Sequence, residues 1–402
     1  MMIDRADTVF VLICAAMVLF MTPALGVLYA GLGRKKSCED IMAQSWISIG
    51  IVTVIWFICG YSLAYGTDHI SVIGGLDHLF LKDVGFAPDA SLGADIPPLA
   101  FFILQVVFAI ITPALVSGAV VERLTMKAYI LFLIFWSILV YIPLAHMVWG
   151  GGLLSQIGLL DYAGGTVVHI SAGFSSLAAA HAVGKRNNID NTPHELGYAS
   201  TACGIILFGW LAFNGSGGLG VNEASVYAFV NSLIGSASGM VVWCILAVVR
   251  EKRADLVAIM MGCLAGLVGV TPGAAYITPQ SAFLAGGIVA IVCYYCMQLK
   301  EKMPMDDTLD VWALHGAGGL AGTILVGIFA DPSLCTIPHA MGKQLLVQMG
   351  SVYAVAAASF VITWFIFMAI KKFVPLRMDE DPEEEIGRKI LEERKKAFGK
   401  AE

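Results

Sequence analysis

The sequence predicts an all-α polytopic membrane protein with eleven transmembrane helices. Apolar residues make up 58% of the 402-residue chain and charged residues only 13%, against about 45–50% and about 25% in soluble proteins. Of the 54 charged residues, 15 lie in Asp379–Glu402. The rest of the chain therefore carries too little charge to cover a soluble surface. This composition excludes a secreted, disordered, fibrous or nucleic-acid-binding protein.

The helices follow from the stretches that contain no Asp, Glu, Lys or Arg. Crossing the hydrocarbon core takes about 20 helical residues, so nine of these stretches predict one helix each. The stretch 256–299 is long enough for two helices, which the turn-forming segment Gly269–Pro279 separates. The ten stretches are 8–33, 41–67, 96–121, 128–160, 162–184, 196–222, 224–249, 256–299, 311–330 and 344–370.

Lysine and arginine predict the orientation of these helices. If the N-terminus lies outside, 21 of the 24 basic residues fall on the inside, including Arg34–Lys36 and the region from Lys371 onward. Only Arg5, Lys82 and Lys343 fall outside. Cytoplasmic loops of membrane proteins are rich in Lys and Arg, so we predict the N-terminus outside and the C-terminus inside.

The charge distribution also divides the chain into a membrane domain, residues 1–372, and a charged cytoplasmic tail, residues 373–402. In the tail, acidic and basic residues alternate around Ile386, Ile390 and Leu391. This pattern is typical of a soluble amphipathic helix.

Two segments share one pattern, at the starts of the fifth and tenth predicted helices. Asp161–Gly173 and Asp310–Gly319 each begin with an acid, place a histidine one to two turns later and continue with small residues. The fifth helix enters from outside and the tenth from inside. Five helices followed by five of opposite orientation predict an inverted 5+5 repeat, with an eleventh helix added and a shared site near the midplane.

The histidines of these segments, His169 and His315, are the main candidates for chemistry. At about 1.5 Å per residue, both can reach the middle of a core about 30 Å thick. A single buried histidine would most simply satisfy a helix–helix hydrogen bond, whereas a matched pair indicates a polar path. Two neutral imidazoles that share one N–H leave a donor and an acceptor for a small molecule or a proton relay. No Cys or carboxylate lies at ligand spacing, so we predict neither a metal nor a cofactor.

Three aromatic residues, Phe108, Trp149 and Phe213, lie near the predicted outer ends of helices. Each alone would suit an interfacial aromatic belt. Together with Asp161 they could instead line an outer vestibule that attracts a cation, since desolvated cation–π contacts are worth about 2 kcal/mol. That energy would hold a small cation without trapping it.

Several long motifs resemble those of the Amt/Rh ammonium transporters, in their bacterial and archaeal Amt branch. The resemblance covers nearly the whole membrane part, beginning at MTPALGVLYAGL (Met21–Leu32). The most specific stretches are HMVWGGG (His146–Gly152), DYAGGTVVHI (Asp161–Ile170), GWLAFN (Gly209–Asn214) and the segment Asp310–Ala330.

The resemblance implies a homotrimer in the plasma membrane, the inner membrane of a bacterial cell, in which each subunit has its own pore. It implies that Trp149 lines an external ammonium site and that Phe108 and Phe213 form a stacked gate below it. His169 and His315 would be the twin histidines of an apolar pore.

The resemblance further implies that Asp161 is a structural acid supporting the site, and Asp310 takes the matching place in the second half. One position departs from the family pattern, which usually has a serine four residues after the second gate phenylalanine. This chain has Gly217 there. Losing a hydrogen bond to a charged ligand costs about 1.5–3 kcal/mol. We expect Ser216 or a water to supply the contact, and we expect Gly217→Ser to strengthen ammonium binding.

The predicted function is therefore ammonium transport, in which ammonium is recruited at the aromatic site, loses its proton and crosses as ammonia. The alternatives are an ammonium sensor that signals through the tail with little or no flux, and a channel for the neutral gas. The tail is a solvated segment, a docking site for a PII-type signal protein, or a connector to a fused signalling module. No nucleophile–base set or phosphate loop indicates an enzyme, and we expect no nucleic-acid partner.

Overall fold

The computed structural model describes residues 2–89, 94–187, 189 and 191–378. Within these ranges, eleven helices are long and apolar enough to cross a membrane. The same residues form three isolated β-bridges and no strand. The predicted all-α, eleven-helix fold is confirmed, while the predicted orientation of the termini stays a prediction.

Five spans consist of one α-helix, two continue from an α-helix into a short 3-10 turn, and four are assembled from shorter segments. The spans are α1 (Arg5–Leu32), α2 with α3 (Cys38–Ile55, Tyr61–Tyr65), α4 (Pro98–Val120), α5 with α6 and α7 (Met126–Trp136, Ile142–Trp149, Leu153–Gln156), η6 with α8 (Gly165–Ile170, Ser171–Val183), α9 (Leu196–Gly215), α10 (Glu223–Glu251), α11 (Leu256–Val270), α12 (Pro279–Lys300), η9 with α13 (Trp312–Ala317, Gly318–Phe329) and α14 (Met341–Ile370).

The stretch 256–299 contains two helices, as predicted. Helix α11 ends at Val270 in a short 3-10 turn, Thr271–Gly273. Helix α12 begins at Pro279, after Thr278 caps it by accepting a hydrogen bond from the Ser281 backbone N–H. Proline suits the first helical position because its missing N–H would have no partner there.

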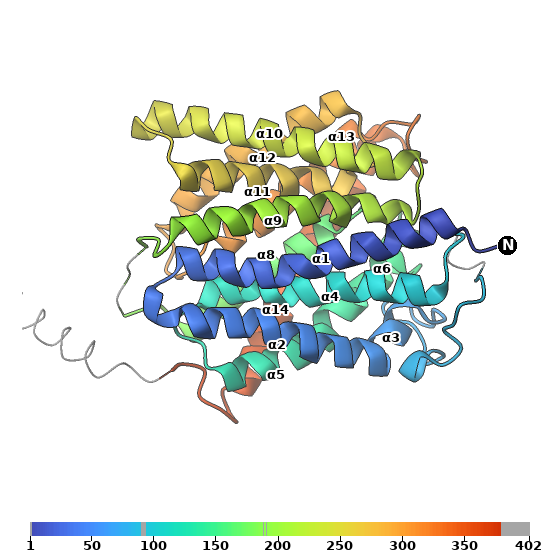
Figure 1. Cartoon of the computed structure of the whole chain (residues 1–402), viewed down its shortest axis with the longest axis horizontal. Coiled ribbons are helices and arrows are strands. Elements are labelled where there is room, and N and C mark those ends of the chain that lie inside the picture. Colours follow the sequence, from blue (N-terminus) through green and yellow to red (C-terminus); the bar gives the residue numbers. More distant parts are fainter. Residues whose placement is uncertain (1, 90–93, 188, 190, 379–402) are drawn as a thin grey trace, which may run out of the picture.

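The helices run side by side along the long axis of the molecule (Figure 1), with α1 and α9 adjacent at its centre. Glycines allow the closest approaches, because lipid gives no hydrophobic drive to pack helices. A Cβ on Gly209 of α9 would overlap the side chain of Met21 on α1. A Cβ on Gly266 of α11 or Gly286 of α12 would overlap the backbone of Gly235 on α10.

The two halves of the repeat touch where η6 and α8 meet η9 and α13. A Cβ on Gly173 would overlap the backbone of Gly316, and a Cβ on Gly319 would lie 2.8 Å from the Cβ of His169. Real Cβ contacts are not this short, so only glycine permits the crossing. This contact brings the two histidine-bearing turns together.

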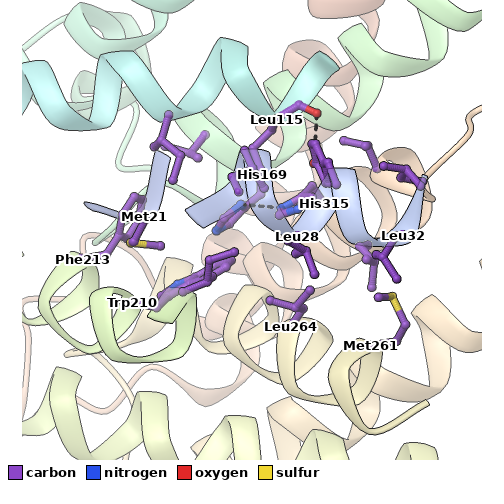
Figure 2. A pocket seen from close by; sticks show the side chains of 18 residues that line it. Met21, Leu28, Leu32, Leu115, His169, Trp210, Phe213, Met261, Leu264 and His315 are labelled. Atoms are coloured by element: carbon purple, nitrogen blue, oxygen red, sulfur yellow. Dashed lines mark hydrogen bonds between the residues drawn. The ribbon is translucent and has the colours of Figure 1, made fainter. Parts of the chain in front are cut away.

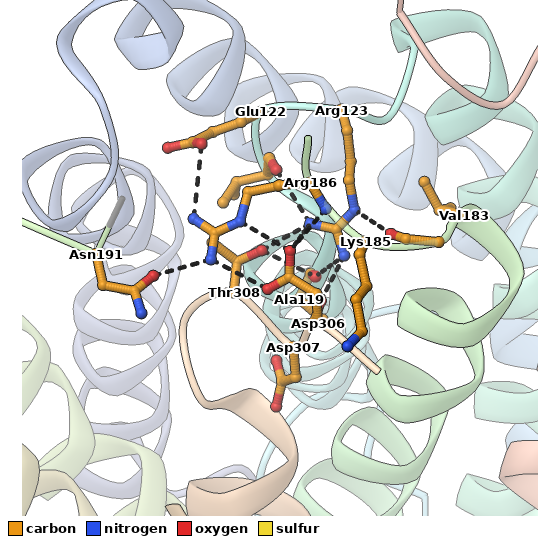
Figure 3. Close-up of polar contacts among 12 residues, drawn as sticks. Ala119, Glu122, Arg123, Val183, Lys185, Arg186, Asn191, Asp306, Asp307 and Thr308 are labelled. Carbon is orange, nitrogen blue, oxygen red and sulfur yellow. Dashed lines mark hydrogen bonds and ion pairs between the residues drawn. The ribbon is translucent and has the colours of Figure 1, made fainter. Parts of the chain in front are cut away.

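A buried charged network ties the loop before η9 to the ends of α4 and α8 (Figure 3). Arg186 donates hydrogen bonds from Nε to Asp306 Oδ2 (2.8 Å) and from Nη2 to Oδ1 (3.0 Å). Arg123 donates to Thr308 Oγ1 (2.7 Å) and to the Ala119 carbonyl (2.9 Å). Burial raises the pKa of Asp306, but the hydrogen bonds from Arg186 outweigh this effect and hold the pKa below its usual range.

The chain after α14 packs against this network. Arg377 donates to the carbonyls of Val183 (3.1 Å) and Lys185 (2.8 Å), and the Met378 N–H donates to the Arg123 carbonyl (2.9 Å). The first residues of the predicted tail are thus attached to the membrane domain. The amphipathic helix predicted for residues 379–402 lies outside the described residues.

Candidate functional site

A carboxylate cap fixes the start of the fifth span. Asp161 Oδ1 accepts hydrogen bonds from the backbone N–H groups of Gly164 (2.9 Å) and Gly165 (2.7 Å), and Oδ2 accepts from the N–H (2.7 Å) and hydroxyl of Thr166. Gly164 has a φ of 110°, a left-handed conformation that favours glycine. Burial raises the pKa of Asp161, and these hydrogen bonds partly offset it.

In the tenth span the capping acid is Asp307, whereas the predicted repeat placed Asp310 in the position that matches Asp161. Asp307 accepts from the backbone N–H groups of Val311 (3.2 Å) and Trp312 (2.7 Å). Asp310 instead pairs with Lys300 and has a φ of 59°. Asp307 precedes His315 by the same number of residues as Asp161 precedes His169. The predicted alignment of the two repeat segments therefore began the second segment three residues too late. It began at Asp310, the acid nearer to the histidine, and not at Asp307.

His169 and His315 meet inside the bundle. Their Nδ1 atoms lie 3.1 Å apart, and both side chains are buried (Figure 2). Both histidines lie in π-helical turns, Gly165–Ile170 (η6) and Trp312–Ala317 (η9), and such turns are frequent at functional sites. His169 Nε2 has no hydrogen-bond partner among the described residues, so it is free for a molecule in the cavity.

The histidines line an apolar cavity, here called the pore cavity. Trp210 packs against both of them, with ring centroids 5.2 Å from His169 and 6.3 Å from His315. Its indole Nε1–H donates to Thr271 Oγ1 (2.9 Å), which fixes the ring. The other lining residues are Met21, Leu25, Leu28, Tyr29, Leu32, Ile111, Leu115, Val168, Ile206, Phe213, Met261, Leu264, Leu309, Val311 and Leu314. No role was predicted for Trp210 from the sequence, although Trp210 lies one helical turn before Phe213.

A second cavity, here called the vestibule, contains the predicted aromatic set. Phe108, Trp149 and Phe213 all line it. The Trp149 indole N–H donates to the Asp161 carbonyl (3.0 Å), so its ring is held beside the capped turn. Phe108 and Phe213 lie with centroids 4.5 Å apart at 84°, which is an edge-to-face contact and not the stacked pair that the resemblance implied.

The structure separates the roles of Ser216 and Gly217. Ser216 is buried, and its hydroxyl donates to the Phe213 carbonyl (3.1 Å) within the same helix turn. Gly217 lines the vestibule and Ser216 does not. The expected replacement of the family serine by Ser216 therefore has no geometric support.

A third cavity, here called the charged cavity, lies at the other end of the pore cavity. Lys185, Arg186 and Lys300 contribute to its lining. The pore cavity shares Phe213 with the vestibule, and it shares Leu32, Met261 and Leu309 with the charged cavity. The three cavities follow one another along the bundle, with Phe213 between the vestibule and the pore cavity that holds the histidines.

A bundle of membrane-spanning helices around such a path defines a multi-pass membrane protein built to pass a small molecule. The chain belongs to the Ammonium Transporter Family, which it matches over residues 9–397.

Named relatives and solved structures agree with this assignment. The chain is 37% identical to an ammonium transporter of Bacillus subtilis, over 98% of this chain and 99% of the relative. The crystal structure of Candida albicans Mep2 is similar with a TM-score of 0.87 and 34% identity, covering 95% of this chain and 88% of Mep2. A structure described as "Sensor Amt Protein" has a TM-score of 0.89 and 28% identity, covering 95% and 96% of the two chains.

Proposed function

We propose that this protein conducts ammonium across the membrane by binding the ion in the vestibule and passing ammonia through the pore cavity. The observation that carries the proposal is the path itself. An aromatic vestibule leads past two phenylalanines to a buried imidazole pair. The family membership and the names of the relatives support ammonium as the substrate.

Recruitment starts at Trp149. Its ring lies in a vestibule with Phe108, at 6.4 Å between centroids. Aromatic faces attract a desolvated cation with about 2 kcal/mol. The binding is strong enough to concentrate ammonium at the mouth and weak enough to release it.

Deprotonation follows from the change in surroundings beyond Phe108 and Phe213. Apart from the two histidines, the described residues that line the pore cavity have apolar or aromatic side chains, and none of these residues is a carboxylate or a lysine. An unpaired ion in such surroundings costs many kcal/mol, whereas a neutral amine can enter by exchanging hydrogen bonds. Ammonium therefore gives up a proton to solvent water on the vestibule side, and neutral ammonia passes the two rings.

The imidazole pair then stabilises ammonia inside the cavity. One of the two Nδ1 atoms carries the hydrogen of their shared contact, and His169 Nε2 remains without a partner among the described residues. A neutral imidazole nitrogen either donates or accepts. Ammonia, which can do both, finds a partner in either tautomer.

Reconstitution into proteoliposomes tests the proposal. An inward ammonium gradient should produce a current, which reports charge movement, or an alkaline shift inside, which reports ammonia. Potassium at the same concentration should produce neither. Empty liposomes and liposomes with an unrelated membrane protein are the controls. Saturable ammonium binding without either signal would contradict the proposal.

That contrary result would support a second candidate, an ammonium sensor. The similarity to the structure described as "Sensor Amt Protein" supports this second candidate. A receptor needs the vestibule and does not need a complete path. A PII-type or fused signalling partner at the tail and a homotrimeric assembly also stay predictions.

A further inference from the structure

A tyrosine beside Trp149 has no role in the mechanism above. Tyr162 lines the vestibule together with Phe108, Trp149 and Gly217. Its hydroxyl oxygen is buried and makes no hydrogen bond with any described residue. Leaving a buried polar group unpaired costs about 1–3 kcal/mol. An unpaired hydroxyl that borders a binding cavity therefore points to a ligand.

The position of Tyr162 is fixed from several sides. Its backbone N–H donates to the Pro272 carbonyl (2.8 Å). Its ring meets Tyr276 edge-to-face, with centroids 5.3 Å apart. The preceding residue, Asp161, holds the Trp149 indole through its carbonyl. The phenol ring and the indole ring are thus held by adjacent residues of one capped turn.

The Tyr162 ring has room in the vestibule because Gly217 has no side chain. A Cβ on Gly217 would lie 2.8 Å from Cε1 and from Cζ of Tyr162, and 3.3 Å from its hydroxyl oxygen. A side chain at position 217 and the Tyr162 ring therefore compete for the same volume. The phenol oxygen lies 3.3 Å from the position at which a serine side chain at 217 would begin.

We infer that the Tyr162 hydroxyl oxygen accepts an N–H hydrogen bond from the ammonium ion held against Trp149. This inference rests on the proposed function, because it assigns a ligand within the same vestibule. Trp149 and Phe108 offer aromatic faces and no lone pair to a cation. The phenol oxygen supplies a lone pair without adding a charge, so it strengthens binding without forming an ion pair that would hold the ion.

Tyr162→Phe removes the oxygen and keeps the ring. In reconstituted protein, the apparent KM for ammonium should rise by about 10-fold or more, since hydrogen bonds to charged groups are worth about 1.5–3 kcal/mol. The maximal flux should stay unchanged because the path beyond Phe108 is untouched. Tyr276→Phe is the matched control, since Tyr276 packs on the same ring but is not among the vestibule-lining residues. Its KM should stay within about twofold of the wild-type value.

Trp149→Leu separates this inference from the proposed function. If Trp149→Leu raises the KM and Tyr162→Phe does not, the vestibule binds ammonium and the inference about Tyr162 is wrong. If neither variant changes the KM, both the vestibule assignment and the inference are wrong.

A double-mutant cycle with Gly217→Ala gives a second, independent measurement. The added Cβ should displace the phenol and raise the KM in the wild-type background. In the Tyr162→Phe background the Cβ still meets the ring, but no hydrogen bond remains to be lost, so the further rise in KM should be smaller. Fully additive effects would contradict the inference. The sequence-based expectation that Gly217→Ser strengthens ammonium binding stays a prediction.

Discussion

Phe213 is the residue at which the vestibule and the pore cavity meet. Its ring lies 4.5 Å from Phe108, 5.9 Å from Trp210 and 6.3 Å from His169, measured between centroids. Since the contact with Phe108 is edge-to-face, the two rings close the path without a parallel stack.

At the scale of single residues, the imidazole pair of His169 and His315 leads to a prediction. His169→Ala and His315→Ala should leave the protein folded, because each removes a cavity-lining side chain. Ammonia would lose one hydrogen-bond partner, worth about 0.5–1.5 kcal/mol, so flux should fall by about 2- to 10-fold. Ammonium-over-potassium selectivity should change as well. Flux and selectivity equal to wild type in both variants would rule out the pore assignment.

At the scale of elements, the crossing of α8 with η9 and α13 depends on glycine. Gly173→Ala should destabilise the protein by about 1–3 kcal/mol, the usual cost of overpacking. The new Cβ would overlap the backbone of Gly316, which cannot rotate away. Gly204→Ala in α9 is the matched control, since nothing lies within 4 Å of its Cβ position. Equal melting temperatures of the two variants in detergent would contradict the prediction.

The buried cap of η9 predicts a pH dependence. Burial raises the pKa of Asp307 to about 6, so the folded protein binds this proton more tightly than the unfolded chain does. Protonated Asp307 stabilises the fold below about pH 4. This contribution to the free energy of unfolding, about 3 kcal/mol at most, is lost as the pH rises through about 6. Asp307→Asn should remove that slope in melting temperature between pH 4 and pH 7. A variant that keeps the full wild-type slope would show that another group is responsible.

The sequence predicted the spans well because a charge-free stretch of about 20 residues has few alternatives in a membrane. It missed the capping role of Asp307, because three acids lie close together before η9 and local pattern does not say which one turns inward. It also missed Trp210 and Tyr162. Their importance comes from contacts with residues of other spans, which spacing along the chain does not encode.

For the whole molecule, the remaining prediction concerns the tail. Deleting residues 379–402 should leave ammonium flux within about twofold of the intact chain. The deletion keeps Arg377 and Met378, whose contacts with Val183, Lys185 and Arg123 attach the chain to the network. Currents and internal pH should be recorded for both forms in parallel. Complete loss of flux on deletion would mean that the tail enables transport and does not merely adjust it.

The glycine contact between the halves also bears on how ammonium on the inner side affects the rate of uptake from the outer side. Gly173 and Gly316 touch through their backbones, and the imidazoles bridge the same crossing. Because these backbones pack so closely, we expect that the two halves do not rock against each other and that the path has no outward-facing and inward-facing forms that must exchange. A carrier must return from its inward-facing to its outward-facing form, and it returns faster when it is loaded with substrate. Substrate on the far side therefore accelerates uptake. A path through fixed halves has no return step, so we expect ammonium already inside only to oppose further inflow.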